Sequence, residues 1–205
     1  AEDKYGLHAD SLFLYGCILE QKAASPFGAP QDLDAADMAY RMAGAHDPQH
    51  GEAHARLSQL CQRRGQPEEA GAAMSMAVTA EPHRSERHLA FASLLKANAD
   101  VEGELAALRA ALRLEPKHAK ARCALGLAMA RQGDLATAEI ELKMAAEADP
   151  RATDSRCFLA HILEELGDLQ GAQAAYREVL AIEPTHPIAK RGLAELGGFM
   201  SAPDP

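Results

Sequence analysis

The sequence is poor in aromatic residues and in the residue types that favour β-strands. It has no tryptophan, and aromatic residues make up 4% of its 205 positions. So few rings leave little material for a surface that stacks nucleobases. Valine, isoleucine and threonine together number 12, whereas alanine, the strongest helix former, supplies roughly a fifth of the chain. This composition predicts an all-α protein and nearly excludes a fold based on a sheet.

An excess of basic residues is also missing. The chain has 21 lysines and arginines against 30 acidic residues, which gives a net charge of −9. Such a chain repels phosphate groups, so we expect neither nucleic-acid binding nor attraction to anionic membranes. No apolar run approaches the roughly 18 residues of a membrane span, and no signal segment stands at the start. Because the first residue is Ala1, we expect a processed or recombinant form or a piece of a longer protein.

The chain contains an internal repeat of fixed length. Five prolines are each preceded by an acidic residue, and each lies 34 residues after the last: Pro48, Pro82, Pro116, Pro150 and Pro184. Chance does not produce four equal spacings in five matching contexts. A fixed period of this size is typical of a stacked repeat architecture.

Each 34-residue unit has the pattern of two helices. In the unit 119–152, apolar residues recur at helical spacing over 119–132 and again over 135–148. Gly133 suits the left-handed residue that ends the first helix, and Asp134 suits the cap of the second. A proline after the second helix prevents it from continuing. The unit is therefore predicted to be a helix–turn–helix hairpin.

Counting back from each proline places residues of one kind at equivalent positions of the units. The eighth place is always small, and the twenty-fourth is always large and apolar: Ser58, Ala92, Gly126 and Ala160, then Met74, Leu108, Leu142 and Tyr176. The twentieth place is alanine in three units, and so is the twenty-seventh in the first three. This pattern resembles the tetratricopeptide repeat family, over about nine-tenths of the chain.

The resemblance implies an all-α fold, a right-handed superhelical solenoid of helix–turn–helix repeats that forms a single domain over residues 1–205. It implies five repeats and a capping helix. The repeats are expected at about 9–50 with an inserted loop at 24–31, at 51–84, 85–118, 119–152 and 153–186, and the capping helix at about 187–197. The inserted loop is interpreted as a plain excursion, with a contact element as the alternative.

The unit 85–118 departs from the pattern. Glu104 occupies a place that holds a small packed residue elsewhere, and Ala99 replaces the glycine of the turn. We expect this unit to be the least regular of the five.

No sequence pattern indicates a catalytic site or a bound cofactor. Zinc-protease, Cys-x-x-Cys, phosphate-loop and dinucleotide-binding motifs are all missing. His46, His50 and His54 are spaced by four, but Pro48 and Gly51 interrupt the helix that would align them. The repeat gives these histidines structural places, with a nickel or zinc site as the alternative. We therefore predict a non-enzymatic protein without cofactor or metal.

The four cysteines are predicted to be free thiols. Cys123 and Cys157 lie 34 residues apart, on equivalent helices of adjacent repeats. Packed helix axes are about 8–10 Å apart, whereas a disulfide needs Cα atoms within about 7 Å. Free thiols favour a reducing compartment, so we expect a cytoplasmic protein. A periplasmic location, or a place in a larger chain, stays open.

The resemblance implies that the first helix of each repeat lines a concave groove that binds a partner. On this basis the candidate partner-binding residues are Arg56, Gln59, Arg63, Leu89, Lys96, Lys120, Leu127, Arg131 and His161. The middle of this groove is rich in basic residues and its far end is acidic, which favours an acidic or C-terminal peptide segment. The alternative is an ordinary solvated surface of mixed charge, with basic residues neutralised by neighbours such as Glu86 or Asp154.

Family members that grip chaperone tails use a clamp of lysine, arginine and two asparagines. This chain has a single asparagine, Asn98, so that role is disfavoured. We therefore expect a scaffold that binds a peptide or helix of a partner protein, without nucleic-acid binding or membrane insertion. Two alternatives remain: a targeting or regulatory domain of a larger enzyme or secretion component, and a self-associating scaffold.

Overall fold

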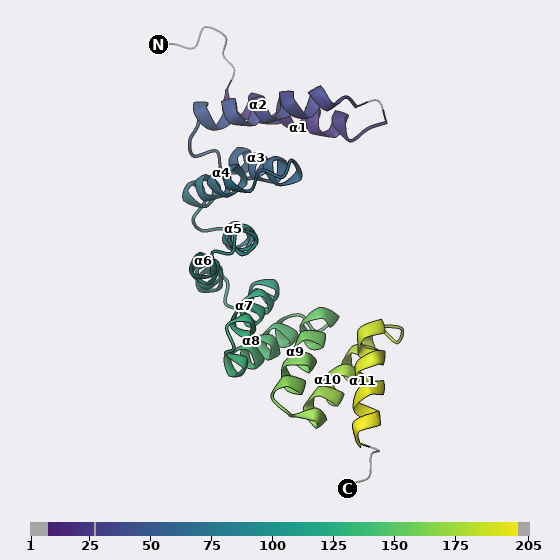
Figure 1. Ribbon diagram of the computed structural model, residues 1–205. Helices are drawn as coiled ribbons and strands as arrows, with labels where there is room; N and C mark the ends of the chain where they lie inside the picture. The colour runs from purple at the N-terminus through teal and green to yellow at the C-terminus, as the bar shows by residue number, and fades with distance from the viewer. Residues whose placement is uncertain (1–7, 27, 201–205) are drawn as a thin grey trace. The chain divides into compact units, whose positions relative to one another are not determined.

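The computed structural model describes residues 8–26 and 28–200. These residues form eleven α-helices and no strand, which confirms the all-α fold class (Figure 1). In chain order the helices are α1 (Ala9–Ala23), α2 (Pro30–His46), α3 (Gly51–Arg63), α4 (Pro67–Ala80), α5 (Ser85–Ala97), α6 (Val101–Leu114), α7 (Ala119–Arg131), α8 (Leu135–Ala148), α9 (Thr153–Glu165), α10 (Leu169–Ile182) and α11 (Pro187–Met200).

The four hairpins between residues 51 and 182 are built alike. Each has a first helix of 13 residues and a second helix of 14 residues, joined by a three-residue turn. The turn needs a left-handed residue, and Gly65, Gly133 and Gly167 supply it with φ between 69° and 82°. Ala99 takes the same place with φ of 58°. The hairpin of α5 and α6 therefore keeps its helix lengths although its turn lacks glycine.

The first hairpin is eight residues longer than the others, and most of the excess is helical. Its helices have 15 and 17 residues; α1 ends at Ala23 and α2 begins at Pro30. The inserted loop predicted at 24–31 is therefore wrong at its end, because Pro30 starts α2 and Asp32 caps it. The Asp32 carboxylate accepts a hydrogen bond from the Ala29 amide at 2.9 Å, and Lys22 of α1 pairs with it at 2.7 Å. The lengthened hairpin end reaches past α3 and α4 (Figure 1).

The chain forms two compact units, Ala1–Ala107 and Leu108–Pro205. The division falls inside α6, in the repeat where Glu104 replaces a small residue; this carboxylate is 4% exposed. In the first unit a cluster of buried side chains from α1 to α5 forms the core, and it includes Ala36, Leu60 and Met74. The small residues that recur at equivalent places of the repeats let neighbouring helices pack closely.

The core of the second unit joins α8, α9, α10 and α11. Leu142, Tyr176 and Val179 are completely buried in it. α11 closes this core with Ala189 and Leu196, which are 0% and 4% exposed. Lys190, Arg191 and Glu195 of α11 are exposed.

Equivalent side chains connect each of three hairpins to the loop before it. At the fourth place of the unit, a side-chain nitrogen lies 2.7–3.2 Å from the carbonyl oxygen of the proline six residues earlier: His54 to Pro48, His88 to Pro82 and Arg122 to Pro116. Since a carbonyl oxygen can only accept, the side-chain nitrogen donates each bond. This contact gives the two histidines a structural place.

Candidate partner-binding site

Several histidines have hydrogen-bond partners within the fold. Within residues 8–26 and 28–200, no three histidine, cysteine or acidic side chains converge where a metal ion could be held. His50 accepts a hydrogen bond from the Ala53 amide at 3.1 Å and so caps α3. Cys17, Cys61, Cys123 and Cys157 are all free thiols, as predicted. Burial, with Asp154 and Glu183 nearby, raises the pKa of Cys157 to about 11, so this thiol is a poor nucleophile near neutral pH.

In the first unit the candidate binding residues lie on α3 and α5. Arg56, Gln59 and Arg63 are exposed and recur at intervals of three and four, so they share one face of α3. Leu89 and Lys96 are two turns apart on α5; Leu89 is half-buried and Lys96 is exposed.

The two arginines on α3 are engaged by carboxylates. Arg63 pairs with Glu20 of α1, and Glu20 also accepts a hydrogen bond from the buried Tyr40 hydroxyl at 2.6 Å. Arg56 contacts Glu52 one turn earlier at 3.4 Å. The positive charge of these arginines is therefore offset within the fold. The alternative of a neutralised surface named Glu86 and Asp154 as possible partners of basic residues, whereas the partners of these two arginines are Glu20 and Glu52.

A chain of ion pairs connects α3 with α5. Glu52 pairs with Arg87, which also pairs with Glu81 at 2.9 Å. Burial acts to raise the pKa of Glu52, but the hydrogen bond and charge of Arg87 outweigh it and lower that pKa. Glu52 is thus kept as a carboxylate, and the network holds the face of α3 against α5.

In the second unit the candidate residues lie on α7 and α9. Lys120, Leu127 and Arg131 share one face of α7, with both basic residues exposed and Leu127 half-buried. On α9, His161 lies 3.2 Å from the Tyr176 hydroxyl and 3.3 Å from a Glu164 oxygen. Its imidazole is therefore already hydrogen-bonded within its own repeat.

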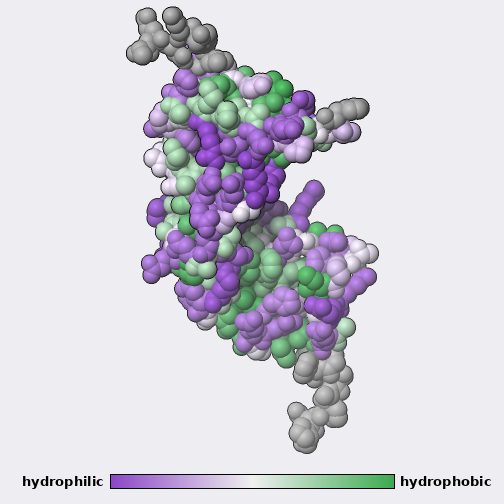
Figure 2. Space-filling view, turned by 45° about the horizontal axis from the view of Figure 1, so that its top comes forward, coloured by the Kyte–Doolittle hydropathy of each residue, from purple (hydrophilic) through white to green (hydrophobic). Residues whose placement is uncertain are grey.

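Lys96 and Lys120 differ from the other candidate cations. Among the described residues neither has an ion pair or hydrogen bond to its ammonium group, and both are exposed. Surface hydropathy alone does not mark a site, because hydrophobic patches lie between hydrophilic ones over the visible face of the protein (Figure 2). Of the candidate residues, Lys96 in the first unit and Lys120 in the second unit are therefore the cations whose charge no other described residue offsets.

The profile of the tetratricopeptide repeat family matches residues 89–153, and a second profile of the same family matches residues 153–186. Residues 89–186 therefore belong to the tetratricopeptide repeat family. No curated protein matches its sequence significantly. No helix within the described ranges has the length and apolar character needed to span a bilayer.

Solved structures of tetratricopeptide repeat proteins share the fold. The crystal structure of MamA protein has a TM-score of 0.73 at 18% identity, covering 98% of this chain and 100% of that one. YrrB, described as a tetratricopeptide repeat protein with an unusual peptide-binding site, has a TM-score of 0.73 at 18% identity, covering 92% and 93%. A tetratricopeptide repeat protein from Parabacteroides merdae has a TM-score of 0.77 at 19% identity, covering 95% and 74%.

Proposed function

We propose that this protein-interaction scaffold holds an acidic peptide or helix of a partner protein against the first helices of its repeats and catalyses no reaction. The observation that carries the proposal is the state of Lys96 and Lys120. Each is exposed on a first helix without a counter-ion among the described residues. In a chain of net charge −9, such cations attract a carboxylate to their own helix face.

The neighbouring candidate residues suit this role. Leu89 and Leu127 are half-buried. Each lies two turns from a lysine on the same helix and offers apolar contact, whereas Arg63 and Arg56 are held in place by ion pairs. A receptor surface that is already ordered loses little entropy when a peptide binds. The peptide-binding site named for YrrB supports the choice of a peptide as the occupant.

The proposal is tested by charge reversal. The tagged protein is used to capture a partner from lysate of the source organism, and the captured protein is identified by mass spectrometry. Its affinity is then measured by calorimetry for the wild type and for Lys96→Glu/Lys120→Glu. The control is Arg151→Glu/Lys190→Glu, which makes the same change of net charge at two other exposed positions.

We expect the Lys96/Lys120 variant to bind at least about tenfold more weakly, since exposed ion pairs contribute up to about 1 kcal/mol each. The control variant is expected to retain the wild-type affinity. Equal affinity of all three proteins would refute a binding face on the first helices.

A further inference from the structure

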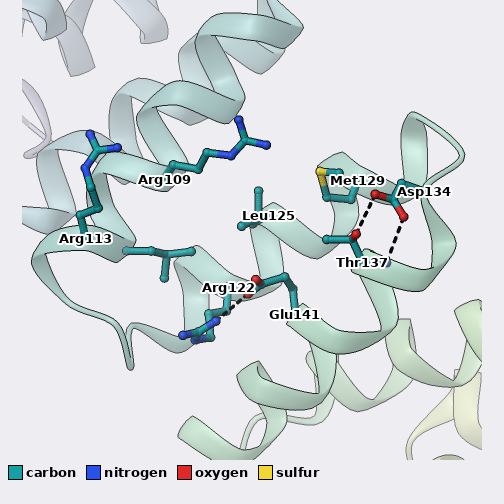
Figure 3. A pocket seen from close by; sticks show the side chains of 9 residues that line it. Arg109, Arg113, Arg122, Leu125, Met129, Asp134, Thr137 and Glu141 are labelled. Carbon is teal, nitrogen blue, oxygen red and sulfur yellow. Dashed lines mark hydrogen bonds and ion pairs between the residues drawn. The ribbon is translucent and has the colours of Figure 1, made fainter.

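A second surface lies in the second unit, on the other side of α7. A cavity of about 650 Å³ opens between the C-terminal half of α6, α7 and the start of α8 (Figure 3). On α7 it is lined by Arg122, Leu125 and Met129. At about 100° per residue, these positions lie on the side of α7 opposite Lys120 and Leu127. The cavity is therefore separate from the candidate residues of the proposed function.

The floor of the cavity is apolar. Leu125 and Met129 of α7 and Leu112 of α6 line it. Leu125 is buried, and the other two are half-buried, so apolar surface stays accessible at the bottom of the opening. A volume of this size falls within the range of sites that receive a ligand side chain or a small molecule.

The acidic residues on the α8 side of the cavity are already engaged. Glu141 accepts a hydrogen bond from Arg122 at 2.7 Å. Asp134 caps α8, accepting bonds from the Thr137 amide at 3.0 Å and hydroxyl at 2.7 Å. These two bonds lower the pKa of Asp134. Figure 3 shows both interactions on that wall.

The α6 side of the cavity carries two arginines without partners. Arg109 and Arg113 are exposed, and no ion pair or hydrogen bond of either side chain occurs among the described residues. They are four residues apart, so two like charges lie next to each other on one face of the helix. Figure 3 shows Arg109 extending from α6 towards the opening.

This pair of arginines contrasts with others in the chain. Arg41 pairs with Asp37, and Arg191 with Glu195, each within one helical turn. Arg109 instead has Leu105 and Arg113 at the corresponding places. Adjacent like charges destabilise an isolated helix slightly, and no acidic side chain among the described residues of the second unit pairs with them. An anionic ligand would supply the missing countercharge.

We infer that the Arg109–Arg113 pocket, lined by these arginines and by Leu112, Leu125 and Met129, is a docking site for an acidic segment of a partner protein. Two carboxylates of the segment, about 6 Å apart as on successive helical turns, pair with the two guanidinium groups. An apolar side chain next to them enters the cavity. The inference does not depend on the proposed binding face at Lys96 and Lys120.

The test uses a defined peptide pool in place of an unknown partner. A displayed library of random 12-residue peptides is selected on the full wild-type chain and depleted on Arg109→Glu/Arg113→Glu. Enriched peptides are synthesised with a fluorescent label, and their affinities are measured by fluorescence anisotropy. Arg151→Glu/Lys190→Glu serves as the control of equal charge, and Arg109→Lys/Arg113→Lys keeps the charge but removes the paired donor geometry.

We expect enriched peptides to contain two acidic residues close to an apolar one. Their affinity should fall at least tenfold on Arg109→Glu/Arg113→Glu, stay unchanged on the control, and fall less with the lysine pair. It should also weaken in 0.5 M salt, because exposed charges are screened. Lys96→Glu/Lys120→Glu should bind the peptides as the wild type does, which separates this site from the proposed function.

Two results would overturn the inference. The first is a selection that yields no peptide dependent on Arg109 and Arg113, or only peptides without acidic residues. The second is self-association that depends on these arginines: a molecular mass, measured by light scattering, that rises with concentration for the wild type but not for Arg109→Glu/Arg113→Glu. Such a result would assign the pocket to a second copy of this chain. Both arginines are exposed, so circular dichroism is expected to show an unchanged helical fold in each variant.

Discussion

The Tyr40 hydroxyl donates a 2.6 Å hydrogen bond to Glu20 across the first hairpin. Tyr40 is completely buried, and Glu20 also binds Arg63 of the next hairpin. Burial, together with a hydrogen bond to Cys17, raises the pKa of Tyr40. The phenol thus stays protonated and positions a carboxylate that fixes one of the candidate binding residues.

Tyr40→Phe is expected to destabilise the protein because it removes the hydroxyl that donates a hydrogen bond to the partly buried Glu20 carboxylate. Hydrogen bonds to charged groups contribute about 1.5–3 kcal/mol, so we expect a loss of about that size in the free energy of unfolding. Urea denaturation followed by circular dichroism measures it. Tyr15→Phe is the control because Tyr15 is 54% exposed, and its effect should stay within about 0.5 kcal/mol. Equal losses in both variants would contradict the role of this bond.

Ala99→Gly is expected to stabilise the protein. Ala99 holds φ of 58° in a turn where the equivalent residues are glycines, and a left-handed conformation costs a residue with a Cβ about 1–2 kcal/mol. Part of this gain is offset by the larger entropy of glycine in the unfolded chain. A rise in the denaturation midpoint is the expected readout. The reverse change, Gly133→Ala at φ of 82°, should lower it.

Gly126→Ala and Gly71→Ala form a matched pair of helix substitutions with opposite expected effects. A Cβ at Gly126 would lie 2.8 Å from Cγ of Leu142, whereas a Cβ at Gly71 meets only Asn98 at an ordinary 3.8 Å. We expect Gly126→Ala to destabilise by about 1–3 kcal/mol through overpacking. Gly71→Ala should stabilise by about 0.5–1 kcal/mol through helix propensity. Thermal melts of both variants decide the point, and a stabilising Gly126→Ala would show that the helices separate easily there.

The buried Cys157 predicts a dependence of stability on alkaline pH. Its pKa is about 11 in the folded protein, compared with an ordinary value of 9.0. Between these values the unfolded chain releases the thiol proton and the folded chain keeps it, so the free energy of unfolding falls as the pH rises from about 9 to about 11. Cys157→Ala should remove this part of the decline. The prediction would be contradicted if the difference in the free energy of unfolding between the wild type and the variant did not change over pH 8–11.

The same thiol should react slowly with iodoacetamide. At pH 8 a pKa of about 11 leaves about one hundredth of the thiolate that an ordinary cysteine has. Alkylation followed by mass spectrometry of the peptide that contains Cys157 measures the rate. Labelling of the urea-unfolded protein is the control, and it should restore the rate of a free thiol.

The repeat fold could be predicted from the sequence because its signals are local and recur. Each proline with its acidic neighbour ends a second helix, and each turn glycine ends a first helix, so the hairpin boundaries follow from residues within one unit. The end of the first hairpin could not be read in this way. Pro30 was interpreted as part of a loop, whereas it starts α2 and Asp32 caps the helix; both functions agree with the rules for helix starts.

The candidate site was less accessible to sequence reasoning because ion pairing depends on tertiary structure. The contact of Arg63 with Glu20 joins residues 43 positions apart, and no repeat position predicts it. Arg109 and Arg113 were missed for another reason: they lie on a second helix, whereas the family pattern directs attention to first helices. A signal was present, since each lacks an acidic residue three or four positions away.

The longer first hairpin changes how stability is distributed along the repeats. Two extra residues in α1 and three in α2 extend these helices by about 3 Å and 4.5 Å, beyond the ends of α3 and α4 (Figure 1). Contacts in this extension, such as Lys22 with Asp32, add to the intrinsic stability of the first repeat but not to its coupling with the second. In a linear array the ratio of these two quantities sets where unfolding begins. The extension therefore makes the first repeat a more independent folding unit than its neighbours.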